Sequence, residues 1–294
     1  MNNIALIILN YNSSKLTKSL AKHLLEFGKE FHIIVVDNCS TDESYRILYD
    51  SFRNTLNVDV IKTESNKGYS AGNNFGFKYA INKYGVDTVG VMNPDVWIKD
   101  CSVIENLYEK LHHDEKYAVI GGATLNADGE FYKGAVGWNI PSNKELITNF
   151  LINNGKLTSE PQFETIEENL VKVDCVVGCF FLIKTSVLKQ IGFLDESVFL
   201  YNEENLLGIK CKEHGLIEVV AIDQFYFHNH NYASLRTESL HAKFRRLNAM
   251  YQSRKYLCDK YYPRYLRFFL LAANIENHCL AILSYIKHRI RRNK

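Results

Sequence analysis

Two neighbouring carboxylates in the segment FLYNEENLL are candidates for acid–base chemistry. Glu203 and Glu204 stand at the start of an expected helix, directly after the aromatic run at 199–201. A carboxylate beside aromatic side chains is partly desolvated, which raises its pKa towards a value that suits a general base. Acidic residues are also favourable in any first helical turn, so a structural role is the alternative.

The segment VMNPDV offers a candidate metal ligand, because Asp95 follows a buried apolar run and a proline. A carboxylate fixed in this way suits Mg²⁺ or Mn²⁺, which take few protein ligands and further oxygens from phosphates. A turn residue is the alternative. His228 and His230 stand at alternate positions of FHNHNYAS, on one face of an expected strand, as metal or phosphate partners would. Without further ligands, such a pair is more often structural.

The elements that must position these residues are short apolar runs that alternate with helical patterns. Strands are expected at 4–9, 32–37, 58–63 and 87–95, with helices at 13–27, from about 41 to 52, and from the glycine-rich loop to 82. Ser40 and Glu43 match the capping box of the second helix. Continuous apolar runs in strand–helix–strand order predict an α/β sandwich for residues 1 to about 125, with a parallel sheet covered on both faces.

Polar residues follow each of these four strands. They are Tyr11 and Asn12, Asp37 and Asn38, the loop SNKGYSAGNN at 65–74, and Asn93 to Asp95. In open parallel sheets, ligands bind beyond the carboxyl ends of the strands, so four clusters at one rim favour a binding site over coincidence. Glycines at 68, 72 and 76 would let the backbone approach a ligand, and a helix beginning there favours negative charge. A plain glycine-rich turn is the alternative.

The pattern beyond residue 125 is looser. A long buried strand entering a helix is expected at 171–188, a helix at 202–215 closed by Gly215, and another strand at 216–230. Residues 143–168 are the most polar stretch and are expected to form a mobile excursion. The apolar core of MNNIALIILNYNSS is too short for a signal peptide, so it is expected to be the first strand.

The composition excludes some classes of protein. The 294 residues allow one large domain or a domain with an appendage, and the net charge of +2 argues against nucleic acid as a partner. Seven scattered cysteines, without zinc-site spacing, fit a reduced cytosolic protein with free thiols.

The segments LNYNS, VVDNCSTDES, NKGYSAGNN, NPDV and GFLDESVFLYNEEN together resemble glycosyltransferase family 2, and most closely its bacterial rhamnosyltransferase-like members. The resemblance covers about residues 3 to 235. It implies the GT-A fold, an α/β fold with a mostly parallel, Rossmann-like central sheet flanked by helices, in a catalytic domain at 1–235. A helical, basic and amphipathic extension is expected at 236–294. The implied activity is inverting transfer of a sugar from a UDP- or dTDP-sugar to a hydroxyl of a glycan or lipid-linked glycan, in bacterial surface polysaccharide synthesis.

The resemblance also implies roles for single residues. Asp37 would bind the base or ribose of the donor. Asn93 and Asp95 stand at the D-x-D metal motif, with Asn93 in place of its first carboxylate. Glu204 falls on the catalytic base, as a Glu rather than the commoner Asp, and Glu203 can share that role. The other residues expected at the donor are Asn10, Tyr11, Asn12, Asn38, Ser40, Lys67, Gly68, Gly72, Asn73, Asn74 and Asn93.

Two other functions are compatible with an α/β protein that binds such ligands. A sugar nucleotidyltransferase should carry a G-x-G-x-R-type loop near its N-terminus, and LNYNSS is not that loop. A non-catalytic subunit that binds a nucleotide sugar or a glycan would explain Asn93 as decay of the metal site.

The last stretch, 267–294, contains nearly twenty mostly apolar residues and ends in six basic ones. Asn274, Glu276, Asn277 and His278 lie near its middle, where polar groups are costly in hydrocarbon, which disfavours a membrane span. Apolar and basic groups side by side suit anionic lipids. We therefore expect a cytoplasmic enzyme held peripherally on the inner face of the membrane. A helix packed on the catalytic domain or on a second subunit of a homo-oligomer is the alternative.

Overall fold

The computed structural model describes residues 3–28, 31–126, 128–130, 134–152, 163–229 and 238–292. The chain divides into two compact units. The sheet unit comprises residues 1–140, 162–196 and 203–229, and the helical unit comprises 141–161, 197–202 and 230–294. All seven cysteines are free thiols.

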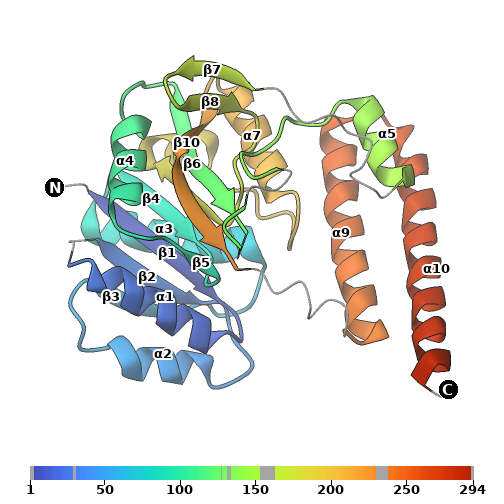
Figure 1. Cartoon of the computed structure of the whole chain (residues 1–294), viewed down its shortest axis with the longest axis horizontal. Coiled ribbons are helices and arrows are strands. Elements are labelled where there is room, and N and C mark those ends of the chain that lie inside the picture. The colour runs from blue at the N-terminus through green and yellow to red at the C-terminus, as the bar shows by residue number, and fades with distance from the viewer. Residues whose placement is uncertain are drawn as a thin grey trace. The chain divides into compact units, whose positions relative to one another are not determined.

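The sheet unit is built on one mixed sheet in the order β3-β2-β1-β4-β9-β6-β10-β8-β7, with β5 paired to β10 (Figure 1). In chain order the strands are β1 (Ile4–Asn10), β2 (His32–Asp37), β3 (Val58–Lys62), β4 (Thr88–Met92), β5 (Val96–Trp97), β6 (Tyr117–Leu125), β7 (Glu164–Glu167), β8 (Leu170–Val173), β9 (Phe180–Lys184) and β10 (Ile217–His228). Strands β3, β2, β1 and β4, which are neighbours in the sheet, run parallel to one another, as predicted. Beyond β4 the sheet is mixed rather than mostly parallel, because β9 runs antiparallel to both β4 and β6.

Helices cover both faces of the sheet, as the continuous apolar runs predicted. The covering helices are α1 (Ser14–Glu26), α2 (Ser44–Phe52) and α4 (Ser102–Leu111) on one face, and α3 (Tyr69–Tyr84), α6 (Thr185–Ile191) and α7 (Glu203–Glu213) on the other. Strand β1 shows the reason: Ile4, Leu6 and Ile8 pack into the first layer, while Ala5 and Ile7 pack into the second. Alternate side chains of a strand point to opposite faces, so a strand buried on both must be apolar throughout.

Two local expectations are wrong. Helix α2 begins at Ser44 rather than near residue 41, and Ser40 does not cap it, because its hydroxyl accepts a hydrogen bond from the Asn12 N–H instead. The expected strand at the start of 171–188 is two strands, since β8 pairs with β10 while β9 lies between β4 and β6. The turn that joins them contains Gly178.

The stretch 143–168 contains regular structure where an excursion was expected. Helix α5 (Asn143–Ile152) and strand β7 account for its two ends, and residues 153–162 lie outside the described residues. The helix at 202–215 is confirmed as α7, with Gly215 in the left-handed region at φ 69°.

The helical unit consists of α5, α9 (Leu240–Tyr261) and α10 (Leu266–Arg292), with α9 and α10 lying side by side (Figure 1). Its core is formed by Leu146, Cys258, Leu266, Leu270 and Ala273. Phe269 packs against this core, whereas eight other large apolar side chains of α10 are exposed: Phe268, Leu271, Ile275, Leu280, Ile282, Leu283, Tyr285 and Ile286. Among the described residues, one helical segment, Leu266–Ile286, is long and apolar enough to cross a membrane.

Glu218 is a carboxyl group buried in the sheet unit. Its side chain on β10 is 2% exposed, and its Oε2 accepts a hydrogen bond of 2.8 Å from the Val176 N–H. Burial, helped by the nearby charge of Asp174, outweighs this hydrogen bond and raises the pKa of Glu218 to about 8. Near neutral pH the folded protein therefore holds a proton that the unfolded chain releases.

This proton makes stability depend on pH. The contribution of Glu218 is fully present below its unfolded pKa of 4.5 and is lost as pH rises through about 8. We expect Glu218→Gln to remove this dependence. The free energy of unfolding of the variant minus that of wild type should therefore increase by on the order of 3 to 5 kcal/mol from pH 5 to pH 9. Urea denaturation across this range measures the difference. Glu213→Gln, an exposed change on α7, is the control and should run parallel to wild type. Parallel curves for Glu218→Gln would contradict the prediction.

Candidate active site

The carboxyl ends of β1 and β2 are joined by a buried polar network. Asn10 Nδ2 donates to Asp37 Oδ2 at 2.9 Å and to Ser40 Oγ at 3.1 Å, while Asn10 Oδ1 accepts from the Thr17 hydroxyl at 2.9 Å. Asp37 Oδ1 accepts from the Ser40 N–H at 3.0 Å. Because Asn10 and Asp37 are fully buried, these bonds also satisfy groups that water does not reach. The network fixes the two loops that follow the strands.

The loops on this network are bent in the left-handed region. Asn12 has φ 52° and Cys39 has φ 56°, a conformation that non-glycine residues adopt mainly at special sites. The Asn12 N–H donates to Ser40 Oγ at 3.0 Å, which holds the first bend. Tyr11, directly before Asn12, is 47% exposed, so its ring is available at the rim.

The third loop is fastened to the second strand end by Asn38. Its Nδ2 donates to Asn66 Oδ1 and to the Gly68 carbonyl oxygen, both at 3.1 Å. Gly68 has φ 97° immediately before α3 begins, and a Cβ on Gly72 would lie 2.5 Å from Leu9 Cδ1. Here the glycines serve a sharp turn and a close contact between helix and strand.

The remaining predicted donor residues of this segment differ in their exposure to solvent. Lys67 is exposed beside the rim, whereas Asn73 and Asn74 are buried in α3. Asn73 Nδ2 donates to the Tyr69 carbonyl oxygen at 3.0 Å. Asn74 Nδ2 donates to the carbonyl oxygen of Leu194 at 3.0 Å and to Glu196 Oε1 at 2.8 Å, so this amide links α3 to the segment after α6.

The candidate metal residues Asp95 and His228 lie together. Strand β5 pairs with the end of β10, with His228 opposite Val96, and this places His228 Nε2 3.3 Å from Asp95 Oδ2. Burial opposes a charged imidazole, but the contacts with Asp95 and Cys179 outweigh it and raise the pKa of His228 to about 10. Asn93 donates its N–H to the Cys179 carbonyl oxygen at 2.8 Å. His230 lies outside the described residues.

One carboxylate and one imidazole fit part of a divalent-ion site. A carboxylate and a neutral imidazole are ligands that Mn²⁺ accepts, so metal binding would displace the proton that His228 shares with Asp95. Mg²⁺ binding usually relies on one or two carboxylates with substrate phosphates. Among the residues that the structure describes, no group of three or more His, Cys, Asp or Glu residues is arranged to hold a metal. Asp95 and His228 would therefore hold an ion whose other ligands come from phosphate or water.

Glu204 is positioned by a close contact between α7 and the segment after β8. A Cβ on Gly208 would lie 2.1 Å from the Asp174 carbonyl oxygen, so only glycine lets the helix pack this closely. Glu203 is 9% exposed, and Glu204 is partly buried beside it. Burial raises the pKa of Glu204, although N–H groups of Glu204 itself and of Gly178 stabilise its charged form.

Two residues around Glu204 were missed by sequence reasoning. The carboxylate lies against Gly178, where a Cβ would be 2.5 Å from Glu204 Oε1. Tyr69, the first residue of α3, donates its hydroxyl to the Gly178 carbonyl oxygen at 2.6 Å. A glycine inside a strand pattern indicates close approach of another group, so Gly178 carried a signal. Tyr69 carried none, because its partner is distant in sequence.

Gly178 and Cys179 connect the two halves of the site. Gly178 contacts Glu204, while Cys179 contacts His228 and accepts the hydrogen bond from Asn93. Consecutive residues of one turn thus contact a carboxylate with a raised pKa and one member of the candidate metal pair, His228. The parallel strand ends with their polar loops adjoin this arrangement through β4, which is the neighbour of β1.

The fold is the GT-A fold of glycosyltransferases. Among solved structures, the mannosyltransferase PcManGT from Pyrobaculum calidifontis, in complex with GDP-Man and Mn²⁺, superposes with a TM-score of 0.59. The match covers 98% of this chain and 75% of that one, at 14% sequence identity.

The chain belongs to glycosyl transferase family 2, because the profile of that family matches residues 5–192. It is 30% identical over 204 residues to the low-salt glycan biosynthesis hexosyltransferase Agl10 of Haloferax volcanii. The aligned region covers 69% of this chain and 60% of that relative. It is 21% identical over 225 residues to the glycosyltransferase GlyG of Streptococcus pneumoniae serotype 4, covering 69% and 71% of the two chains.

Proposed function

We propose that this protein is an inverting glycosyltransferase that moves a sugar from a UDP- or dTDP-sugar to a hydroxyl of a glycan or lipid-linked glycan, in the synthesis of a bacterial surface polysaccharide. The observation that supports the proposal is the turn at Gly178 and Cys179, because Gly178 contacts Glu204 and Cys179 contacts His228 of the candidate metal pair. Membership of family 2 and the hexosyltransferase and glycosyltransferase names of the relatives support the reaction class.

In the proposed reaction, Glu204 accepts the proton of the acceptor hydroxyl. The oxygen forms a bond to the anomeric carbon from the side opposite the diphosphate, while the bond from that carbon to the diphosphate oxygen breaks. The nucleoside diphosphate leaves with the bonding electrons, and the configuration is inverted. A bound Mg²⁺ or Mn²⁺ would offset the negative charge on the leaving diphosphate.

The other rim residues would bind the donor. Asp37, Asn38 and Ser40 would bind the base and ribose. Hydrogen bonds from Asn10 and Asn12 to this group support their loops. Tyr11 offers an exposed ring for stacking on the base. The donor side would be completed by backbone and side-chain amide groups that contact the nucleotide sugar, from Gly68, Gly72, Asn73 and Asn93.

The proposal predicts metal-dependent hydrolysis of a nucleotide sugar when acceptor is absent. A thermal-shift screen of UDP- and dTDP-sugars with Mn²⁺ selects the donor, and release of the nucleoside diphosphate then measures hydrolysis. A chain that binds a donor but never releases the diphosphate would instead be a non-catalytic binding subunit.

Asp95→Asn is expected to raise the Mn²⁺ concentration for half-maximal hydrolysis by about tenfold, because one charged ligand becomes neutral. Asp50→Asn, an exposed change on α2, is the control and should leave the Mn²⁺ titration unchanged. If Asp95→Asn and wild type gave the same Mn²⁺ titration, Asp95 would not be a metal ligand.

We further propose that the helical unit binds the inner face of the membrane. The exposed apolar residues of α10 at 268, 271, 275, 282 and 286 recur at intervals of three, four and seven, so they lie on one side of the helix. The opposite side packs on α5 and α9 through Leu266, Leu270 and Ala273. The basic residues that follow in sequence, from Lys287 to Lys294, complement anionic lipid.

The combined change Phe268→Ser, Ile275→Ser and Leu283→Ser is expected to release the protein from vesicles of phosphatidylglycerol and phosphatidylcholine, because it removes apolar surface outside the core of the helical unit. Co-sedimentation measures binding, and 1 M salt should weaken the binding of wild type. Leu56→Ser, at an apolar residue that is 87% exposed in the sheet unit, is the matched control and should bind as wild type does. Binding that survives both the triple change and high salt would refute a lipid-binding role.

A further inference from the structure

The sheet unit contains a cavity that the donor and base residues do not explain. It has a volume of about 390 Å³ and lies between α1 and the segment around β5. Leu16, Leu20, Pro94 and Val96 form part of its wall. The size is within the range of small-molecule sites, and Asp95 lies on its border, so the cavity adjoins the candidate metal residues.

One wall of the cavity is a rigid group of rings. His23 stacks on Trp97 with centroids 5.4 Å apart and planes at 18°, and Phe227 packs on Trp97 at 5.4 Å. His23 Nε2 donates to the Ile98 carbonyl oxygen at 2.8 Å, which fixes the imidazole. Trp97 nevertheless remains 39% exposed. A large indole held in place but left open to solvent offers an apolar surface to a ligand at little entropic cost.

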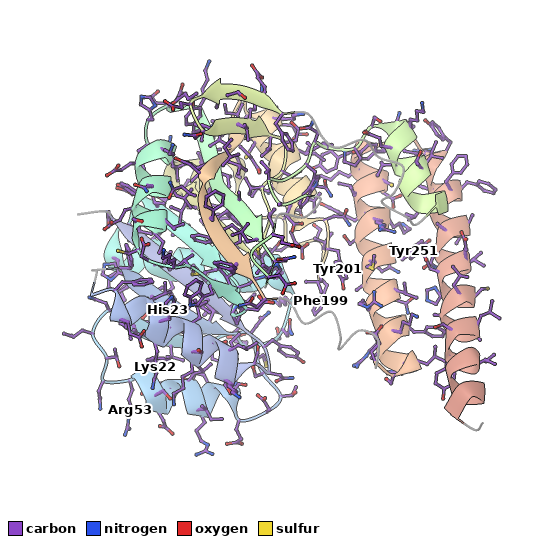
Figure 2. The ribbon with its side chains drawn as sticks, in the orientation of Figure 1. Lys22, His23, Arg53, Phe199, Tyr201 and Tyr251 are labelled. Atoms are coloured by element: carbon purple, nitrogen blue, oxygen red, sulfur yellow. The ribbon has the colours of Figure 1, made fainter. Side chains whose placement is uncertain are left out.

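Polar groups surround this ring wall. Glu26, Lys22 and Ser19 contribute from α1, and Asn229 and Asp95 contribute from the opposite side. Lys22 and His23 are consecutive residues of α1, and both are labelled in Figure 2. Two carboxylates against one ammonium disfavour a phosphate, while carboxylate, amide and hydroxyl groups are good partners for sugar hydroxyls.

We propose that this cavity binds a neutral sugar ring of the acceptor, next to the reacting sugar. The C–H face of a pyranose packs on Trp97, and its hydroxyls donate to Glu26 and to the side-chain oxygen of Asn229. This inference rests on the proposed glycosyl transfer and assigns a binding site in the sheet unit to one sugar ring of the glycan acceptor. It also assigns the cavity to acceptor rather than donor, because a diphosphate inside it would meet the carboxylate of Glu26, which does not belong to the candidate metal pair.

The chain permits a direct binding test, since Trp97 and Trp138 are its two tryptophans. Trp138→Phe leaves Trp97 as the one fluorescent indole, and Trp97→Phe leaves Trp138 as the matched control. We expect methyl β-D-galactopyranoside, methyl α-L-rhamnopyranoside or methyl N-acetyl-β-D-glucosaminide to change the emission of Trp97, with half-saturation on the order of 1 to 50 mM for a single ring. The control variant should not respond.

UDP with Mn²⁺ is the second arm of the test. A response of Trp97 to UDP and not to the glycosides would give the cavity to the donor and overturn the proposal. No response to any glycoside would overturn it as well. This fluorescence readout needs no turnover, so it tests the cavity independently of the proposed function. Absence of donor hydrolysis would refute the transfer reaction, whereas absence of glycoside binding at Trp97 would refute the cavity proposal alone.

A kinetic variant links the cavity to transfer. Trp97→Ala is expected to raise the KM for a disaccharide acceptor by about tenfold, consistent with loss of one stacking contact, and to leave donor hydrolysis unchanged. An unchanged acceptor KM would show that the cavity does not take the acceptor. Tyr49→Ala, at an exposed aromatic residue on α2, is the control and should leave both constants at the wild-type value.

Discussion

Replacing Glu204 with Gln is expected to lower turnover by about 10²- to 10⁴-fold while the affinity for the donor is unchanged. The amide has nearly the shape of the carboxylate and can still accept the hydrogen bond from the Gly178 N–H. It cannot accept a proton, so the loss falls on the transfer step. The rate of transfer and the affinity for the nucleotide sugar, measured separately, test both halves of this expectation.

The pH dependence provides a second readout of the same residue. Because burial raises the pKa of Glu204, the base is lost by protonation at a higher pH than for an exposed carboxyl group. Turnover of wild type should therefore fall as pH drops through this raised pKa, and the residual activity of Glu204→Gln should lack that limb. Glu203→Gln is the matched control on the preceding residue. A larger loss in Glu203→Gln than in Glu204→Gln would move the base to Glu203.

The parts of the fold that sequence predicted are those governed by local pattern. Strands β1 to β4 follow from continuous apolar runs, and their polar ends were predicted to share one rim because parallel strands end on the same side. The hydrogen bonds from Asn10 to Asp37 and from Asn38 to the Gly68 segment confirm that the loops meet.

What the sequence could not predict depends on contacts between distant segments. The S-x-x-E pattern at Ser40 was interpreted as a capping box, but the tertiary partners Asn10 and Asn12 take the Ser40 hydroxyl. The split at 174–179 follows from strand partners that no local pattern specifies. Asp95 and His228 were both candidates, yet their contact depends on pairing between β5 and β10.

The helical unit shows a different limit. Periodicity predicted an amphipathic helix at 267–294, and α10 is a helix with one covered side and one exposed apolar side. The covering partners are α5 and α9, so packing within the chain and apolar exposure occur on the same helix. The sequence presented these as alternatives, because an apolar stripe does not indicate which of its residues will find a partner.

Gly178→Ala is expected to reduce turnover by about 10²-fold without unfolding the protein, because a displacement of about 1 Å in a reacting group has effects of this size. The new Cβ would lie 2.5 Å from Glu204 Oε1 and 3.0 Å from its Cγ and Cδ. These atoms belong to a flexible side chain, so the carboxylate moves while the backbone stays. The melting temperature should remain near that of wild type, and donor binding should be retained.

Tyr69→Phe is a smaller change that tests whether the Tyr69 hydroxyl supports this turn. It removes the hydroxyl that donates to the Gly178 carbonyl oxygen, and the loss of one hydrogen bond predicts a reduction in turnover of up to about tenfold. Tyr79→Phe on the same helix is the matched control, because the Tyr79 hydroxyl accepts only from the exposed Lys83 among the contacts that the structure gives it. Turnover in Tyr79→Phe should equal that of wild type.

A double-mutant cycle distinguishes displacement of the base from general damage. If Gly178→Ala acts by moving Glu204, then adding it to Glu204→Gln should lower turnover little further, since the group it displaces no longer accepts a proton. If the two losses multiply instead, Gly178→Ala harms the site by another route, and the role of the turn as the support of Glu204 is refuted. The same cycle with Tyr69→Phe should give the same non-additive pattern at smaller amplitude, because the Tyr69 hydroxyl holds the carbonyl of Gly178, which contacts Glu204.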